Sequence, residues 1–165
     1  MLLLAHASIA DVVRNAIQIV GMAPGFRTVS SFFLMMLCQP HHQAKSGMTF
    51  SDCGLVIDPD EQQLADSARA LVGEEPCVAM LSFSTSGSAH HAKVDKVVAA
   101  ARRVRAQRPE LAIDEDVRLD AALVEDVAKR KLPDSKVGGH ANVLIFPNLE
   151  AGNIGYKLAE RIGGA

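Results

Sequence analysis

The chain has 165 residues, of which 48% are apolar and 22% charged, and its formal net charge at pH 7 is −2. This composition is typical of a folded globular domain and excludes a disordered tail. The small net charge excludes a general affinity for nucleic acid or acidic membranes, and the absence of tryptophan, with Tyr156 as the single tyrosine, argues against a base-stacking platform.

The predicted elements alternate between strands and helices along the chain. In chain order they are a helix at 11–20, strands at 28–37 and 49–57, a helix at 61–71, a strand at 77–83, a helix at 94–107, a short strand at 111–113, a helix at 119–130, a strand at 142–146 and a helix at 151–162. Polar loops are predicted at 39–47 and 133–139. The repeated β-then-α order indicates one α/β domain with a mostly parallel sheet and helices on its faces.

Neither a membrane segment nor a disulfide framework is predicted. The start, Met1-Leu-Leu-Leu-Ala5, lacks basic residues and is too short for a signal peptide, and the apolar run 32–38 is too short to span a bilayer. We interpret that run as a buried strand. Cys38, Cys53 and Cys77 are widely spaced and odd in number, which favours reduced core thiols in a cytoplasmic protein over a disulfide or zinc site.

Two strand-to-helix turns are candidates for a ligand site. The first is Leu81-Ser-Phe-Ser-Thr-Ser-Gly-Ser88, and the second follows the strand at 142–146 and includes Ala151-Gly-Asn-Ile-Gly155. In a parallel sheet such turns open on the carboxyl edge, where helix-start N–H groups bind anions. The first turn is either a cradle for a phosphate or carbonyl oxygen or a serine-rich turn that caps the next helix, with equal weight.

The second turn matches neither the dinucleotide fingerprint nor the phosphate-loop pattern, so its glycines serve either close ligand approach or helix–strand packing. Lys157 and Arg161 are four residues apart and share one helix face. They either bind a polyanion together or form an exposed basic stripe. Arg14 is the corresponding candidate on the first helix, either a buried anion ligand or a surface residue with a buried stem.

The histidines do not indicate a metal site. His41-His42 and His90-His91 are adjacent pairs whose side chains project in different directions, and no carboxylate pattern accompanies them. His91 follows the first turn and either meets a substrate phosphate or lies in water. No Gly-x-Ser-x-Gly elbow is present. The residues alone therefore predict an α/β protein that binds a phosphorylated ligand.

Nearly the whole chain, in the same order, is similar to one known family. The matching segments are residues 10–14, 24–36, 50–53, 78–85, 87–89, 94–98, 119–123, 141–147 and 151–157. On these segments the chain resembles the phosphate acetyltransferase (phosphotransacetylase) family of the phosphate acetyl/butyryltransferase group. The resemblance implies a three-layer α/β/α fold like that of isocitrate and isopropylmalate dehydrogenases, with residues 1–165 forming a partial domain. Roughly residues 1–40 belong to the first subdomain and the rest mostly to the second.

The resemblance also implies an activity, which is reversible transfer of an acetyl group between acetyl-CoA and inorganic phosphate to give acetyl phosphate. The family's mechanism is taken to be direct attack of the coenzyme A thiolate on the acetyl carbonyl, without an acyl-enzyme. Coenzyme A is then a substrate, and neither a bound cofactor nor a metal is implied. The implied partners are the small-molecule substrates and a second copy in a homodimer, in the cytoplasm.

The family's functional residues carry over to six positions. Arg14 matches an arginine that helps to bind coenzyme A, Lys157 and Arg161 match basic residues near its phosphates, and Ser84, Thr85 and Gly87 match the active-site turn. Against the family pattern, Ile9 replaces a threonine and Ser86 a lysine. The match begins inside the usual family protein, and the family's catalytic Ser-Arg pair and aspartate would lie beyond Ala165, so the chain is expected to be truncated at both ends.

The sequence is also compatible with two other functions. One is a catalytically incompetent fragment that binds coenzyme A or acetyl phosphate or that oligomerises, in which the strand at 32–37 would be exposed. The other is the phosphate-acyltransferase-like tail of a malic enzyme, which differs at the Ser84-Thr85 turn. Preference for acetyl over propionyl or butyryl groups is not decided by these residues.

Overall fold

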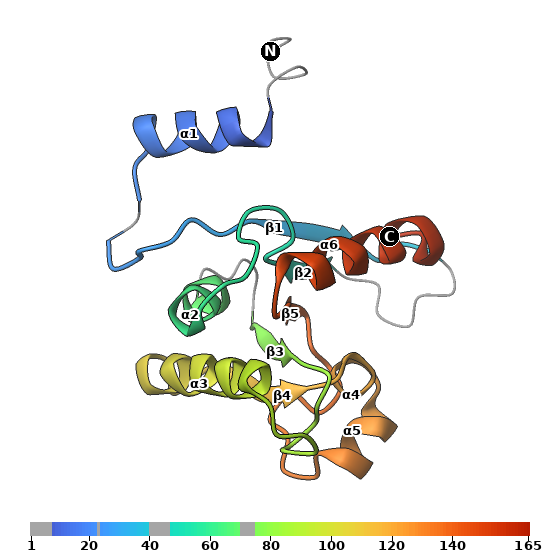
Figure 1. The fold of residues 1–165 in the computed structure, drawn as a ribbon. Helices are drawn as coiled ribbons and strands as arrows, with labels where there is room; N and C mark the ends of the chain where they lie inside the picture. Colours follow the sequence, from blue (N-terminus) through green and yellow to red (C-terminus); the bar gives the residue numbers. More distant parts are fainter. Residues whose placement is uncertain (1–7, 23, 40–46, 70–74) are drawn as a thin grey trace.

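A computed structural model of the chain describes residues 8–22, 24–39, 47–69 and 75–165, and within them a five-stranded sheet forms the centre (Figure 1). The strand order is β1-β2-β5-β3-β4. Only the first pair is antiparallel and the other three pairs are parallel, which confirms the predicted mostly parallel sheet. The strands are β1 (Phe32–Met36), β2 (Gly47–Ser51), β3 (Cys77–Leu81), β4 (Ala112–Val117) and β5 (Val143–Ile145).

Helices cover both faces of this sheet. The described helices are α1 (Ile9–Ile19), which lies apart from the sheet, α2 (Glu61–Arg69), α3 (Ala92–Gln107), α4 (Leu119–Leu123), α5 (Glu125–Lys131), α6 (Leu149–Leu158) and a π-helical turn, η2 (Ala159–Gly163). Helices α2 and α3 pack on one face, whereas α4, α5 and α6 contribute to the core on the other. The three-layer architecture is therefore as predicted.

Alternating residues of the central strands supply the two cores. Val78 and Met80 of β3 point to the α2–α3 face, and Ala79 and Leu81 point to the opposite face. All four are nearly inaccessible to solvent. Strands buried on both faces need apolar residues at every position, which explains the continuous apolar run at 77–81.

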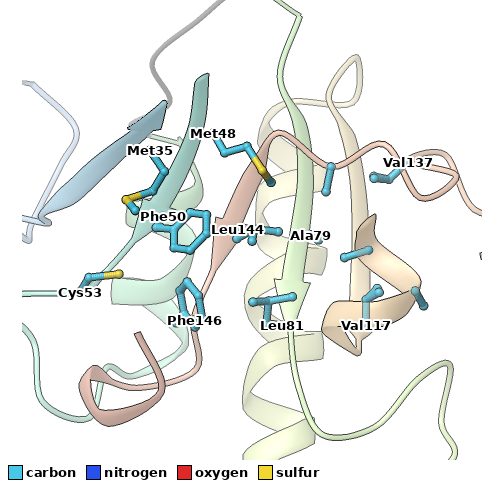
Figure 2. Packing of buried hydrophobic residues seen from close by; sticks show 13 residues of the cluster. Met35, Met48, Phe50, Cys53, Ala79, Leu81, Val117, Val137, Leu144 and Phe146 are labelled. Atoms are coloured by element: carbon cyan, nitrogen blue, oxygen red, sulfur yellow. The ribbon is translucent and has the colours of Figure 1, made fainter. Parts of the chain in front are cut away.

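The core on the opposite face combines aromatic and sulfur-containing side chains, such as Met48 and Phe50, with aliphatic ones such as Leu144 (Figure 2). The rings of Phe50 and Phe146 lie 5.5 Å apart between centroids. Helix α6 closes on them through its glycines, since a Cβ at Gly155 would lie 2.8 Å from the Phe146 ring and one at Gly152 would lie 2.6 Å from the Asp52 carbonyl oxygen. The glycines predicted for the second turn therefore lie within α6, where they allow close packing of helix on strand.

Several boundaries differ from the prediction, and three of these differences have a local physical reason. Strand β2 ends at Ser51 because the Asp52 carboxylate accepts hydrogen bonds from the N–H groups of Gly54, Leu55 and Val56 and so forms a turn. The helix predicted at 119–130 is divided in two, because Val124 is extended and separates α4 from α5.

Strand β4 reaches Val117, four residues past the predicted end, since its acidic residues 114–116 hid the strand from a pattern based on apolar runs. The residues at 40–46 of the predicted loop 39–47 lie outside the described residues, as do residues 70 and 71 of the predicted helix 61–71.

The prediction of a buried strand at 32–38 was wrong. Leu34 and Met36 are 55% and 51% exposed, and in β1 only Met35 is buried. β1 is an edge strand that pairs with β2 alone, and Figure 1 shows α1 lying apart from the sheet rather than over this strand. Apolar residues of α1 are exposed as well, with Ile19 at 84%.

The cysteines divide between core and surface. Cys53 is buried, and burial with the nearby Asp52 charge raises the pKa of its thiol to about 12. Cys77 is half-buried and Cys38 is exposed, so the prediction of core thiols was right for Cys53 but wrong for Cys38. None of the described helices has the length and apolar character needed to cross a membrane.

Candidate functional site

The turn after β3 is built around the buried hydroxyl of Ser84. This hydroxyl donates to Oδ2 of Asp116 at 2.8 Å and accepts a hydrogen bond from the N–H of Ala89 at 3.1 Å. Because Ser84 has no solvent-accessible surface, its hydroxyl holds the turn together and is not open to a ligand in this conformation.

Asp116, near the end of β4, holds this turn against the neighbouring strand. Its Oδ2 also accepts from the N–H of Gly87 at 2.8 Å, and its carbonyl oxygen accepts from the N–H of Ser86 at 3.0 Å. Asp116 is buried with a positive φ of 53°, and among the described residues its Oδ1 has no hydrogen-bond partner. A buried, incompletely paired carboxylate in a strained backbone position is typical of functional sites.

Thr85 is nearly buried as well. Its Oγ1 accepts a hydrogen bond from the N–H of Arg118 at 3.2 Å, and its own N–H donates to Ser88 Oγ at 3.0 Å. The exposed residues of the turn are therefore Phe83, Ser86, Gly87 and Ser88. The turn does not cap α3 with a serine, since the N-cap is His91, whose Nδ1 accepts from the N–H of Lys93 at 3.1 Å.

A cavity of about 400 Å³ lies on the Gly87 side of the turn, between α3, β4 and the loop after α5. Its walls carry both signs of charge. Arg102 and Arg105 form ion pairs with Glu115 at 3.7 and 2.5 Å, and further carboxylates come from residues 95, 114, 116 and 134. This excess of acidic groups disfavours an anionic ligand.

A second cavity, of about 150 Å³, lies on the other side of the turn between the ends of β3 and β5. It is lined by Ser82, Phe83, Lys93, Lys96, Val97, Pro147 and Asn148. It therefore includes residues of both turns that the sequence predicted as candidates. Its charged lining residues are lysines, so it favours an anion, in contrast to the larger cavity.

With this geometry in place, comparison with known proteins identifies the family. The model of the family described as "Phosphate acetyl/butaryl transferase" matches residues 4–165. The chain belongs to this family.

Its relatives and structural neighbours agree with this assignment. The chain is 50% identical over 167 residues to a phosphate acetyltransferase of Paracoccus denitrificans, a match that covers 97% of this chain and 52% of that protein. Its fold is similar to the crystal structure of a phosphotransacetylase from Streptococcus pyogenes, with a TM-score of 0.86 and 41% identity over 97% of this chain and 49% of the other. The chain spans about half the length of the relatives that it matches.

The basic residues that the family resemblance selects lie on the surface. Arg14 is 63% exposed and pairs with Asp11 at 2.8 Å on the same helix, so the interpretation as a buried anion ligand does not describe this structure. Lys157 Nζ donates to Asn153 Oδ1 at 2.8 Å, and Arg161 lies 3.6 Å from Glu160. Among the described residues, no hydrogen bond or ion pair joins Arg14, Lys157 or Arg161 to the Ser84–Gly87 turn.

Sequence reasoning missed Asp116 and Lys93. Asp116 is 32 residues from Ser84, so no local pattern connects them, although an acidic run between the apolar residues Ile113 and Val117 was a usable signal. Lys93 lies just before the predicted helix at 94–107, and no local pattern distinguishes it from other lysines. Within the described residues, no three His, Cys, Asp or Glu side chains converge in a metal-binding arrangement, and His41 and His42 lie outside that part.

Proposed function

We propose that this chain functions as a phosphate acetyltransferase, moving an acetyl group between coenzyme A and inorganic phosphate. The observation that carries the proposal is its identity of up to 50% to proteins named phosphate acetyltransferase, along nearly its whole length. The ordered turn at the carboxyl edge of β3, with a basic cavity beside it, supports the same conclusion because phosphorylated ligands bind at this edge of parallel sheets.

The transfer forms one bond at the acetyl carbon and breaks another. The coenzyme A thiolate attacks the carbonyl carbon of acetyl phosphate, a carbon–sulfur bond forms, and the bond to the phosphate oxygen breaks. Phosphate leaves with the electron pair, giving acetyl-CoA. The protein positions the two substrates and stabilises the developing oxyanion. We assign the positioning role to the turn that contains Ser84, Thr85 and Gly87, and coenzyme A binding to Arg14, Lys157 and Arg161.

The test is an assay of acetyl phosphate formation from acetyl-CoA and phosphate by the purified chain and by Arg14→Ala. Arg130→Ala is the matched control, because Arg130 is exposed on α5 and lines neither of the two cavities beside the turn. We expect Arg14→Ala to lower the rate by about tenfold or more, as for loss of one charge-assisted contact, and Arg130→Ala to leave it unchanged. Equal rates for both variants would contradict the assignment of Arg14. Parallel assays with propionyl-CoA and butyryl-CoA would define the acyl preference.

A specific observation favours a second candidate function, which is association through an apolar surface. Exposed apolar side chains come from α1, β1 and α6 with η2, among them Ile19, Leu34, Met36, Ile154 and Ile162. Exposed apolar surface of this kind marks protein contacts. The chain would then bind coenzyme A or acetyl phosphate or oligomerise without catalysing transfer. Absence of transfer by a folded chain, with binding or self-association retained, would select this candidate.

The remaining family properties belong to the same proposal. We propose a homodimer, which sedimentation velocity of the chain and of Leu34→Lys would test, and a cytoplasmic location, which fits the free thiols of Cys38, Cys53 and Cys77. A subdomain boundary near residue 40 and a likeness to the isocitrate dehydrogenase fold stay predictions. Limited proteolysis around that residue would test the boundary.

A further inference from the structure

The smaller cavity lies at the point where the chain connections diverge. From β3 the chain passes into α3 on one face of the sheet, and from the adjacent β5 it passes into α6 on the other face. In open α/β sheets, ligands bind in the crevice that opens at such a point. The cavity is lined by residues from both connections, including Ser82 and Phe83 after β3 and Asn148 after β5.

The polar groups around this cavity are mainly hydrogen-bond donors. The Asn148 Oδ1 atom already accepts from the N–H of Ala151 at 2.9 Å, which leaves its amide N–H₂ to donate. The Ser82 Oγ atom accepts from the N–H of Ser84 at 3.0 Å, which leaves its hydroxyl hydrogen to donate. Lys93 and Lys96 add two ammonium groups, which donate only. A ligand for this set must supply several acceptors.

The charge near the cavity is positive. Lys96 pairs with Asp58 at 2.7 Å, and the pKa of Asp58 is lowered by this hydrogen bond and charge and, to a smaller extent, by the charge of Lys93. Within the described residues, Lys93 forms no salt bridge of its own. Two ammonium groups therefore face one carboxylate, and one positive charge is left for a ligand.

We propose that this cavity binds a phosphate group, with Lys93 and Lys96 as its cationic ligands and Ser82 and Asn148 as additional donors. Its volume of about 150 Å³ admits a phosphate but is well below the roughly 300–1,000 Å³ of pockets for drug-sized ligands. The larger cavity is a poorer candidate, because its arginines are paired with Glu115 and surrounded by further carboxylates. The identity of the phosphate, inorganic or part of coenzyme A, rests on the proposed function.

The test measures binding directly and needs no turnover. The wild-type chain, Lys93→Glu and Lys136→Glu are each titrated with inorganic phosphate and followed by ³¹P line broadening. Lys136 is an exposed lysine outside the cavity, so both variants change the net charge equally. We expect Lys93→Glu to raise the Kd about tenfold or more, as for a lost charge-assisted hydrogen bond, with Lys136→Glu close to wild type.

Titration with coenzyme A and with 3′-dephospho-CoA distinguishes the two sources of the phosphate. If Lys93→Glu weakens coenzyme A but not the dephospho form, the cavity holds the 3′-phosphate. If it weakens inorganic phosphate alone, the cavity is the inorganic phosphate site. Absence of any phosphate binding by wild type, or equal effects of the two variants on every probe, would overturn the proposal. Binding that depends on Lys93 in a chain without transfer would instead contradict the proposed function while leaving this site in place.

Discussion

The sheet ends in two edge strands of opposite character. β4 carries acidic residues, and its apolar side chains Ile113 and Val117 are buried beneath helices on both faces. β1 is apolar at every position, yet most of its side chains are exposed. One ring contact is described between β1 and α6. In it Phe33 stacks on Tyr156, with 4.4 Å between the ring centroids.

This contrast shows that apolar composition does not decide burial, which depends on what covers a strand. Charged side chains on an edge strand oppose pairing with another chain, whereas an apolar uncovered edge favours it. We therefore expect stability to depend on the β4 side of the molecule, and association to depend on the β1 side. Of the four predictions below, given from the largest expected effect to the smallest, the first two compare the stability of the two sides and the last two concern the β4 side.

Truncation of one apolar side chain on each edge strand gives the largest difference. Ile113→Ala should lower the free energy of unfolding by about 2–5 kcal/mol, because it opens a cavity in a fully buried core. Leu34→Ala, at a half-exposed position, should change it by less than about 0.5 kcal/mol. Urea denaturation measures both. Comparable losses of unfolding free energy in the two variants would mean that β1 is covered in solution.

Substitution of two glycines with positive φ distinguishes the cost of backbone strain from the cost of overpacking. A Cβ at Gly139, where φ is +84°, would lie 2.6 Å from the Glu125 nitrogen, whereas one at Gly21, where φ is +76°, would have no atom within 4 Å. Gly21→Ala should cost about 1 kcal/mol from φ alone, and Gly139→Ala about 3 kcal/mol because overpacking adds to it. Thermal unfolding measures both variants. Equal losses of stability would refute the expectation that overpacking adds to the cost at Gly139.

Removal of the Asp116 carboxylate should loosen the turn after β3. Asp116→Ala leaves the buried Ser84 hydroxyl and the Gly87 N–H without their acceptor, and should cost about 2 kcal/mol. Asp116→Asn keeps an acceptor oxygen and should cost less. Hydrogen exchange at the Gly87 N–H reports the opening of the turn directly. Unchanged protection in the alanine variant would show that Asp116 does not hold it.

The smallest effect is a pH dependence near α4. The hydrogen bond from Lys131, followed by that from Arg118, lowers the pKa of Asp120 from 3.8 to about 2. A lowered folded-state pKa stabilises the protein above 3.8, and this contribution is lost as the pH falls toward 2. Because the pair is half-exposed, the effect is small. In denaturant unfolding at several pH values, the free energy of unfolding should fall slightly less on acidification for Lys131→Ala than for wild type. A larger fall for the variant would contradict the role of Lys131 in lowering the Asp120 pKa.

Apolar periodicity predicted most of the fold because local patterns suffice for it. The run 77–81 indicates a strand buried on both faces, and the spacing of Val97 and Ala101 indicates the buried side of α3. The turn around Ser84 was recognised from its composition. Its attachment to Asp116 was not recognised, because that contact joins the turn after β3 to the neighbouring strand β4, 32 residues further along the chain.

Local sequence patterns determine some features of this protein, and tertiary contacts determine others. Composition, periodicity and turn residues by themselves determined a mostly parallel α/β sheet and placed the candidate turns at its carboxyl edge, since strand direction and turn position follow from element order. Only the tertiary structure decided that β1 is exposed, that Ser84 is enclosed, and that Lys93, Lys96 and Asn148 line one cavity. These features depend on the neighbours of each residue in space, which spacing along the chain does not specify.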